Sequence, residues 1–189
     1  MEEPTYHHVN VDGLKVLAHP LRIRMLGLLR MHGPATASGL AQRVGESSGT
    51  TSWHLRQLAE AGFIEEDTER GNRRDRWWRA AQDYTTVREQ SLPEDPEVQD
   101  ALGAYLVNIL DGYHERAVQF IRERHAWDEP WRHTSNMSDW ALPMEPEEAK
   151  RFFADIEAVV ERYRRDHRPG DQQVAVQFQA YPLREENLS

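Results

Sequence analysis

The strongest constraint in this sequence is a pair of short helical segments that are separated only by a tight turn. Thr36 is placed to cap the first segment, and Gly45 is placed to end it. Ser47 or Ser48 is placed to cap the second segment, which runs until Gly62. Two short helices joined in this way form a helix-turn-helix pattern.

A hairpin pattern follows the helix pair, and two further helices precede it. Residues 63–68 and 74–79 are expected to form two strands, with Gly71-Asn72 as the turn between them. Upstream, helices are expected over residues 11–18 and 20–32, because Pro20 suits the first turn of a helix. A helix-turn-helix followed by a hairpin predicts a winged helix.

The remaining sequence predicts a division of the chain into four segments. Residues 1–10 are expected to be a flexible arm, and residues 11–82 the winged helix-turn-helix domain. Residues 83–96 are polar, contain two prolines and are expected to be a linker. Residues 97–189 are expected to form a mainly helical dimerisation unit that also has a place for an effector. The predicted fold class is therefore α+β, mainly α.

Three patterns organise the predicted C-terminal unit. Apolar residues recur at steps of three and four from residue 97 to residue 125, which predicts a helix about 40 Å long. A second amphipathic helix is expected over residues 146–167, and the alternating residues 174–178 predict a half-buried strand. Because one further helix cannot cover so long an apolar stripe, we expect the long helix to pair with a second copy.

Charge is distributed unevenly along the 189 residues. The chain carries 23 basic and 32 acidic residues, a net charge of −9. Residues 11–80 hold 11 basic and 8 acidic residues, a net charge of +3, whereas residues 81–189 hold 12 and 22, a net charge of −10. A uniformly acidic protein binds nucleic acid poorly. The uneven distribution therefore predicts two different tasks for the two parts.

Several classes of protein are excluded by what the sequence lacks. There is no cysteine, which excludes disulfides, thiolate zinc sites and thiol catalysis. No apolar run approaches the roughly 20 residues of a membrane span, and no signal-peptide pattern opens the sequence, so we expect a cytoplasmic protein. We expect no enzyme, because there is no glycine-rich phosphate loop, no His-Glu-x-x-His motif and no nucleophile elbow.

Small and polar side chains fill the first turns of the second helix of the pair. Short hydroxyl groups let a helix approach the major groove, and longer polar groups reach base edges or phosphates. The residues of this helix that we expect to face DNA are Ser48, Thr50, Thr51, Ser52, His54, Arg56 and Gln57. In the hairpin, Arg73, Arg74 and Arg76 lie at or beside the turn, where they suit phosphates or a minor groove.

Three stretches of residues 11–82 resemble one family. Residues 17–22, Leu-Ala-His-Pro-Leu-Arg, resemble the opening of ArsR-type winged-helix transcriptional regulators. Residues 52–64 are similar to their recognition helix running into the first wing strand, and residues 70–79 are similar to the wing of a subgroup. The resemblance implies a homodimer that binds a short pseudo-palindrome in double-stranded DNA, usually as a repressor released by an inducer. The C-terminal unit is larger than in the small metal sensors of that family.

A metal-responsive repressor is one alternative that the resemblance leaves open. Other members of the family bind zinc or a similar ion between paired helices through Asp, His, His and an acid. This chain offers Asp111, His114, His125 and Asp128, although Gly112 occupies the place where the first acid is expected. Carboxylates and imidazoles are suitable zinc ligands. No other cofactor is expected.

An organic effector is a second option, and a protein partner is a third. Trp127, Trp131 and Trp140 lie in an irregular stretch beside the two apolar helices. Such aromatic residues can line a pocket, or they can cap the core of the C-terminal unit. A winged helix used for protein contact is favoured by the net charge of −9 and opposed by the basic wing.

Overall fold

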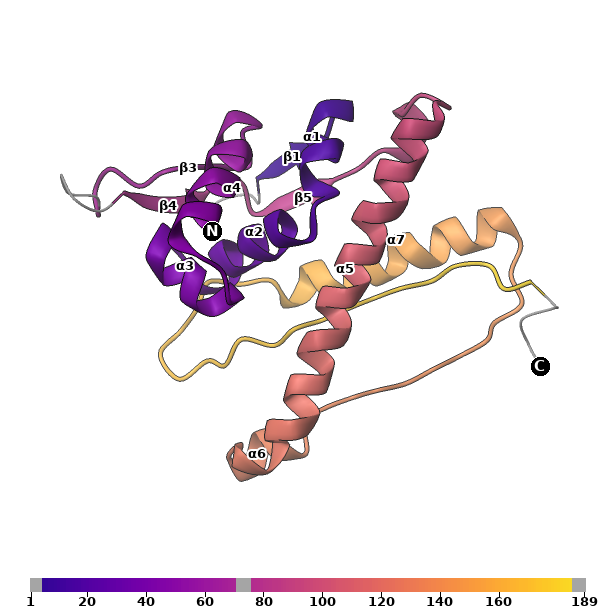
Figure 1. Ribbon diagram of the computed structural model, residues 1–189. Coiled ribbons are helices and arrows are strands. Elements are labelled where there is room, and N and C mark those ends of the chain that lie inside the picture. The colour runs from indigo at the N-terminus through magenta and orange to yellow at the C-terminus, as the bar shows by residue number, and fades with distance from the viewer. Residues whose placement is uncertain (1–4, 71–75, 185–189) are drawn as a thin grey trace. The chain divides into compact units, whose positions relative to one another are not determined.

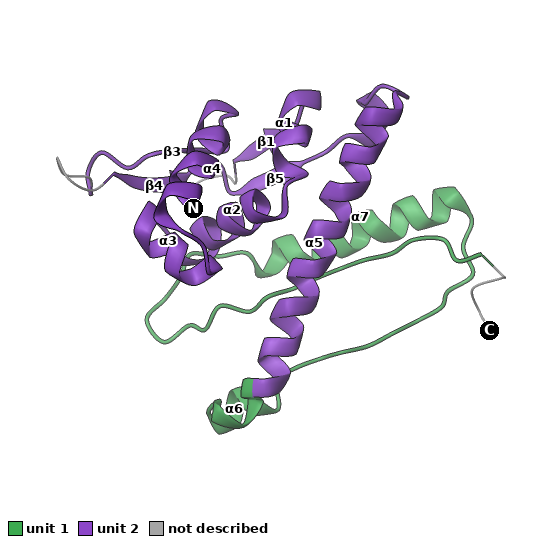
Figure 2. Cartoon of the chain, viewed as in Figure 1, with its two compact units in different colours: residues 1, 123–189 green, residues 2–122 purple. Residues whose placement is uncertain are grey.

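The computed structural model describes residues 5–70 and 76–184 of the chain. Two compact units are distinguished in Figure 2, one of residues 2–122 and one of residues 123–189 together with Met1. The described strands and the helices α1 to α5 belong to the first unit, apart from the last residue of α5, and α6 and α7 belong to the second (Figure 1). The predicted fold class, mainly helical with a small sheet content, is confirmed.

The unit of residues 2–122 is the winged unit, and four helices build its first part. Capping and terminating residues set the ends of these helices. They are α1 (Val11–Leu17), α2 (Pro20–His32), α3 (Ala37–Val44) and α4 (Ser48–Glu60). Thr36 caps α3, since its hydroxyl accepts from the Gly39 amide at 3.1 Å. Ser47 caps α4 in the same way, through the Thr50 amide at 3.1 Å. Gly45 ends α3 in the left-handed region, at φ 76°. The helix-turn-helix prediction is confirmed.

A three-stranded antiparallel sheet forms the wing. Its strands are β2 (Ala35–Thr36), β3 (Ile64–Glu66) and β4 (Trp77–Ala80), in the order β2-β4-β3. Ile64 lies opposite Ala80, and Ala35 lies opposite Trp78. The predicted hairpin is confirmed, while its turn residues lie outside the described residues. The strand β2 was not predicted, because two residues are too few for an alternating pattern.

A second, two-stranded sheet joins residues that were expected to lie in the arm and the linker. Here β1 (Tyr6–His8) pairs in parallel with β5 (Tyr84–Thr86), and Tyr6 lies opposite Tyr84 with ring centroids 5.4 Å apart. The Asp83 carboxylate accepts from the Thr5 amide at 2.9 Å. The prediction of a flexible arm is therefore wrong at Tyr6–His8, and the predicted linker contains the strand β5. A 3-10 turn, η1 (Glu89–Ser91), follows β5.

One apolar core holds the winged unit together. Its fully buried side chains come from every helix of the domain and from the residue before β3: Leu14, Leu17, Met25, Leu29, Leu40, Leu55, Leu58 and Phe63. Trp78 of β4 closes the core on the sheet side. This packing fixes α4 on α2 and α3 and thereby positions its outer face.

The long helix α5 (Pro96–Glu123) begins on this core and continues beyond it. Val98, Leu102 and Tyr105 are buried in the core cluster, and burial raises the pKa of Tyr105 to about 12. The Asn108 side-chain amide donates to the Ala18 carbonyl at 2.8 Å, which ties α5 to the end of α1. A 3-10 turn, η2 (Arg124–Ala126), follows, so the helix matches its predicted extent closely.

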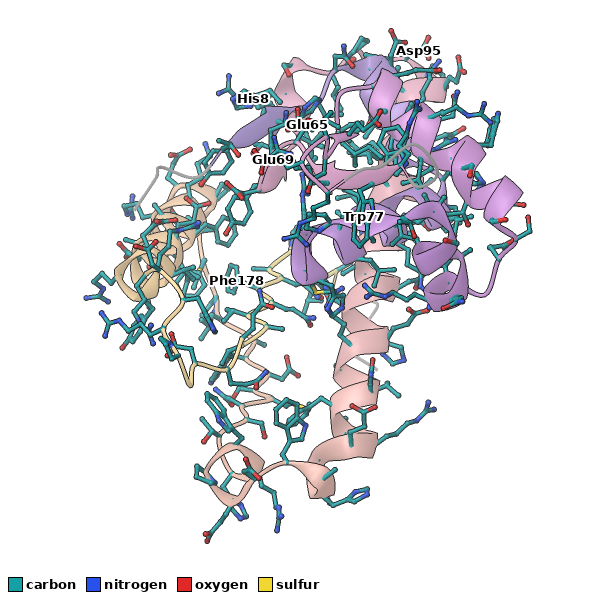
Figure 3. The ribbon with its side chains drawn as sticks, turned by 90° about the vertical axis from the view of Figure 1, so that its left-hand side faces the viewer. His8, Glu65, Glu69, Trp77, Asp95 and Phe178 are labelled. Carbon is teal, nitrogen blue, oxygen red and sulfur yellow. The ribbon has the colours of Figure 1, made fainter. Side chains whose placement is uncertain are left out.

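The second unit contains α6 (Glu129–Arg132) and α7 (Pro146–Tyr163). The ring of Phe178 lies 5.9 Å from Phe152 and 6.1 Å from Phe153 of α7, centroid to centroid (Figure 3). No residue described between 123 and 184 is buried. The predicted strand at residues 174–178 is wrong, because none of the described residues pairs with this segment as a strand and Val174 and Val176 are exposed. Within the described part of the chain, no helix combines the length and the apolar character of a membrane span.

Candidate nucleic-acid interface

A groove runs between the start of α3, the outer face of α4 and the strand β4. It encloses about 450 Å³, and its lining residues are Thr36, Ala37, Ser38, Ser48, Ser52, Arg56, Arg76 and Trp78. Ser48, Ser52 and Arg56 repeat at steps of four along α4, so they share one face of the helix. Four of the residues predicted to face DNA are thus brought together on one surface.

Two arginines supply the positive charge of this groove. The Arg56 Nε–H donates to the Ser52 carbonyl at 3.3 Å, and the side chain stays exposed. Arg76 forms an ion pair with Glu66, with 3.0 Å between Nε and Oε2, and its guanidinium lies 5.5 Å from the Trp78 ring centroid. Both contacts orient Arg76 beside α4. A guanidinium so oriented is a ready donor for a phosphate.

The start of α3 contributes groove residues that the sequence reasoning missed. The Thr36 hydroxyl caps α3, and its oxygen lies 3.1 Å from the Ser38 hydroxyl oxygen. Ser38 is exposed beside the first turn of the helix. Helix starts present unpaired amides that attract phosphates. The capping signal at Thr36 could have identified this end of α3 as part of the interface.

Thr51 and His54 do not face outward, and their prediction as DNA-facing residues is wrong. Thr51 is 0% exposed and His54 is 5% exposed. They share their side of α4 with the core residues Leu55 and Leu58, at helical steps of three and four. This spacing was visible in the sequence, but the polar character of the two residues concealed it.

Thr50 and Gln57 are accessible residues of α4 that make contacts within the helix. The Thr50 hydroxyl lies 2.8 Å from that of Ser47, and the Gln57 side-chain amide donates to Glu60 at 3.0 Å. These contacts hold the two side chains near the helix. Neither residue lines the groove.

After β3 the chain enters a turn that is stabilised by Asp67. Its carboxylate accepts from the Glu69 and Arg70 amides at 3.2 and 3.3 Å, and Arg70 forms an ion pair with it at 3.6 Å. Such a carboxylate-centred turn reverses the chain locally. The wing arginines Arg73 and Arg74 lie outside the described residues.

The residues considered for metal binding fall in both units. Asp111 and His114 are exposed on α5 within the first unit, whereas His125 lies in η2 and Asp128 precedes α6 in the second. Over residues 5–70 and 76–184, no group of three or more His, Asp or Glu side chains is arranged to hold a metal ion. The four candidates are therefore divided equally between the two units.

The tryptophans considered for an effector pocket differ in exposure. Trp127 and Trp131 are half-buried, whereas Trp140 is 72% exposed. All three belong to the second unit. Trp140 therefore contributes little to any enclosed site in the single chain.

Comparison with known proteins identifies part of the winged unit. Residues 17–67 match the family model described as a helix-turn-helix domain. No curated protein matches the chain. The match covers α2, α3, α4 and β3 and so includes both helices that line the groove, whereas Arg76 and Trp78 lie beyond it.

Several solved structures are similar to this chain at low superposition scores. One is the homodimeric winged helix-turn-helix DNA-binding domain of "a possible ArsR-family transcriptional regulator" from Mycobacterium bovis, with 22% identity, TM-score 0.35, and coverage of 57% of this chain and 81% of that one. Another is a "possible transcriptional regulator for arsenical resistance", with 28% identity, TM-score 0.33, and coverage of 59% and 96%. A transcriptional regulator from Thermotoga maritima has 10% identity, TM-score 0.32, and coverage of 76% and 77%.

The assignment rests on the family match and on the geometry of the chain itself. The family match covers α4, and the geometry of the chain places the small, polar and basic outer face of α4 beside Arg76, the residue before β4. Helices of this kind enter the major groove in helix-turn-helix proteins. Residues 17–67 are therefore a helix-turn-helix domain, which supports a DNA-binding transcription regulator.

Proposed function

We propose that the chain is a homodimeric repressor of the ArsR type that binds a pseudo-palindromic operator. The observation that carries this proposal is the groove in which Ser48, Ser52, Arg56 and Arg76 meet. In the proposed complex α4 enters the major groove, and its hydroxyl groups permit a close approach. Arg73 and Arg74 belong to the proposed contact as phosphate ligands of the wing.

The exposed apolar side of α5 supports the homodimer. Val98, Leu102 and Tyr105 are buried against the winged core, whereas Leu106, Val107 and Leu110 remain 40%, 55% and 45% exposed. In the proposed dimer a second copy covers these side chains. Two-fold pairing would present the two recognition helices to successive major grooves, about 34–36 Å apart.

Release by a small-molecule effector is the regulatory part of the proposal. The second unit supports it, because its apolar side chains are not enclosed in a core of their own. Trp127 and Trp131 are half-buried there and would report a bound molecule by fluorescence. A screen of organic compounds and of zinc, scored by release of DNA, tests this part.

The test of the proposed function is a fluorescence anisotropy titration with DNA from upstream of the protein's own gene. A shuffled sequence is the control, and both are titrated at two salt concentrations. We expect tight binding to the upstream DNA that weakens steeply with salt. Replacing Arg73 and Arg74 by Glu should abolish binding while the protein stays folded and dimeric. Equal, weak binding of both DNAs would overturn the proposal and favour a winged helix used for protein contact.

A further inference from the structure

Two histidines contact each other on the buried side of α4, the proposed recognition helix. The ring centroids of His19, which precedes α2, and His54 of α4 are 4.5 Å apart. His54 is only 5% exposed, and within the described residues its buried Nδ1 has no hydrogen-bond partner. A buried polar atom without a partner is costly, which suggests a role beyond packing.

His19 contributes to the fold through a nitrogen that must be unprotonated. Its Nδ1 accepts a hydrogen bond from the Leu21 amide at 3.2 Å and so caps α2. An imidazole nitrogen accepts only while it carries no proton. The cap therefore requires neutral His19, with its proton on Nε2. Protonation of Nδ1 would remove the cap of α2.

The charges that face the pair come from two elements. Arg22 of α2 donates to the carbonyls of Lys15 and Val16, which holds its guanidinium at the end of α1 near both rings. Glu46, in the turn between α3 and α4, faces His54 with the opposite charge. A proton on either ring would place a second positive charge near Arg22, and Glu46 opposes that cost at His54.

The two imidazoles share the same direction of pKa shift. Burial, and then the charge of Arg22, lowers the pKa of His19 below its ordinary value. Burial, and then His19 and Arg22, lowers the pKa of His54, against a smaller opposing effect of Glu46. Folding therefore favours the neutral form of both rings.

The contact between His19 and His54 lies close to two parts of the molecule that the proposed function requires, the groove and the helix α5. Ala18, directly before His19, accepts the hydrogen bond from Asn108 of α5. His54 lies on α4 between Ser52 and Arg56, both of which line the groove. A change at the two rings would thus act on the recognition helix and on the connection to α5 together.

We propose that His19 and His54 form a pH-sensitive contact that holds the recognition helix in place only while both imidazoles are neutral. Its effect on DNA affinity rests on the proposed function, whereas its effect on the fold does not. Mild acid is the proposed signal. Protonation would remove the cap of α2, loosen α4 and weaken operator binding.

The direction of the pH dependence follows from the lowered pKa values. Between the folded value and the ordinary value of about 6.5, the unfolded chain binds more protons than the folded one. The contribution of the neutral pair is therefore complete above about pH 6.5 and is lost as the pH falls below it. Each histidine can change the unfolding equilibrium by up to about tenfold per pH unit in that window.

Three substitutions separate titration from packing. His19→Asn keeps a side-chain oxygen that can cap α2 but cannot titrate. His54→Gln keeps a polar side chain without a titrating ring. His32→Asn is the matched control, because His32 is an exposed histidine at the end of α2.

The primary test is independent of DNA and uses the full chain in a buffer with a metal chelator. Histidine ring NMR signals and urea unfolding are followed from pH 7.5 to pH 5.0. We expect two ring signals with midpoints below the ordinary value of about 6.5, one of which is absent in His19→Asn and the other in His54→Gln. The unfolding equilibrium of the wild type should shift by up to about fivefold more between pH 6.5 and 5.5 than that of His19→Asn. The control should behave as the wild type.

The second test measures operator affinity at pH 7.5 and pH 5.5 by anisotropy. The dissociation constant of the wild type should rise at least threefold more than that of His19→Asn, with His32→Asn unchanged. Two midpoints near the ordinary value of about 6.5 would overturn the inference. Should His54→Gln fail to fold, the wild-type titration and His19→Asn still decide it. Absence of DNA binding at pH 7.5, together with two low midpoints, would overturn operator binding and support the contact.

Discussion

The winged unit and the second unit use the same kinds of local pattern with opposite results. In the winged unit, Leu55 and Leu58 of α4 are buried in a core that also contains Phe63 and Trp78. In the second unit, α7 is more strongly amphipathic than α4, yet Val159 and Val160 remain about 40% exposed. The difference shows that periodicity determines a helix, while burial depends on what the rest of the chain brings to its apolar face.

The largest contrast is expected between two phenylalanines. Phe63→Ala should lower the free energy of unfolding by about 3–5 kcal/mol, because its ring is fully buried between the helices and the sheet. Phe178→Ala should lower it by less than about 1 kcal/mol, because that ring is 46% exposed and its ring contacts among the described residues are with Phe152 and Phe153 of α7. Urea unfolding of both variants measures the contrast.

A large loss of unfolding free energy in Phe178→Ala would contradict the expected difference between the two units. It would mean that the aromatic cluster of the second unit is enclosed in solution, by a second copy or by another part of the chain. Repeating the measurement at several protein concentrations separates these cases, since only a dimer makes the loss depend on concentration.

A second contrast concerns which exposed apolar face forms the proposed dimer. Leu110→Glu on α5 should raise the dissociation constant of the dimer by about 30- to 100-fold, because an apolar contact is replaced by a charge. Val160→Glu on α7 should change it less than about threefold. Sedimentation velocity across a dilution series measures both. The reverse order would assign the dimer contact to the second unit.

Most helices and strands of the winged unit could be predicted from the sequence, because the signals that bound them are local. Ser47 caps α4 and Gly45 ends α3, and both could be recognised within a few residues of the helix that they bound. The pairing of Tyr6–His8 with Tyr84–Thr86 could not, because parallel strands joined over such a distance leave no mark in either segment.

The candidate site was predictable in part, for a related reason. Ser48, Ser52 and Arg56 lie four residues apart on α4, so the interface on that helix followed from its period. Ser38 of α3 lines the same groove only because α3 packs beside α4, which is a tertiary effect. At residues 174–178 the alternation predicted a strand, but a strand also requires a partner.

A third contrast uses two arginines of the wing, Arg76 directly before β4 and Arg79 within it. Arg76 lines the groove and pairs with Glu66, whereas Arg79 pairs with Glu65 at 2.7 Å on the opposite face of the strand. Arg76→Ala should weaken operator binding by about 5- to 30-fold and lower the salt slope by about one. Arg79→Ala, and Arg151→Ala on α7, should leave both within about twofold. Anisotropy at four salt concentrations measures them. Equal losses in Arg76→Ala and Arg79→Ala would show a general charge effect instead of a contact.

The smallest contrast compares two helix starts. The Ser47 hydroxyl accepts from the Thr50 amide at 3.1 Å, so Ser47→Ala should lower the free energy of unfolding by about 1 kcal/mol. Glu145 occupies the same position before α7 but makes no side-chain capping bond, so Glu145→Ala should change it by at most about 0.5 kcal/mol. Urea unfolding measures both, and far-UV circular dichroism checks that α7 persists. A larger loss in Glu145→Ala would mean that α7 is part of the cooperative unit, because only a helix coupled to the core can change its global stability.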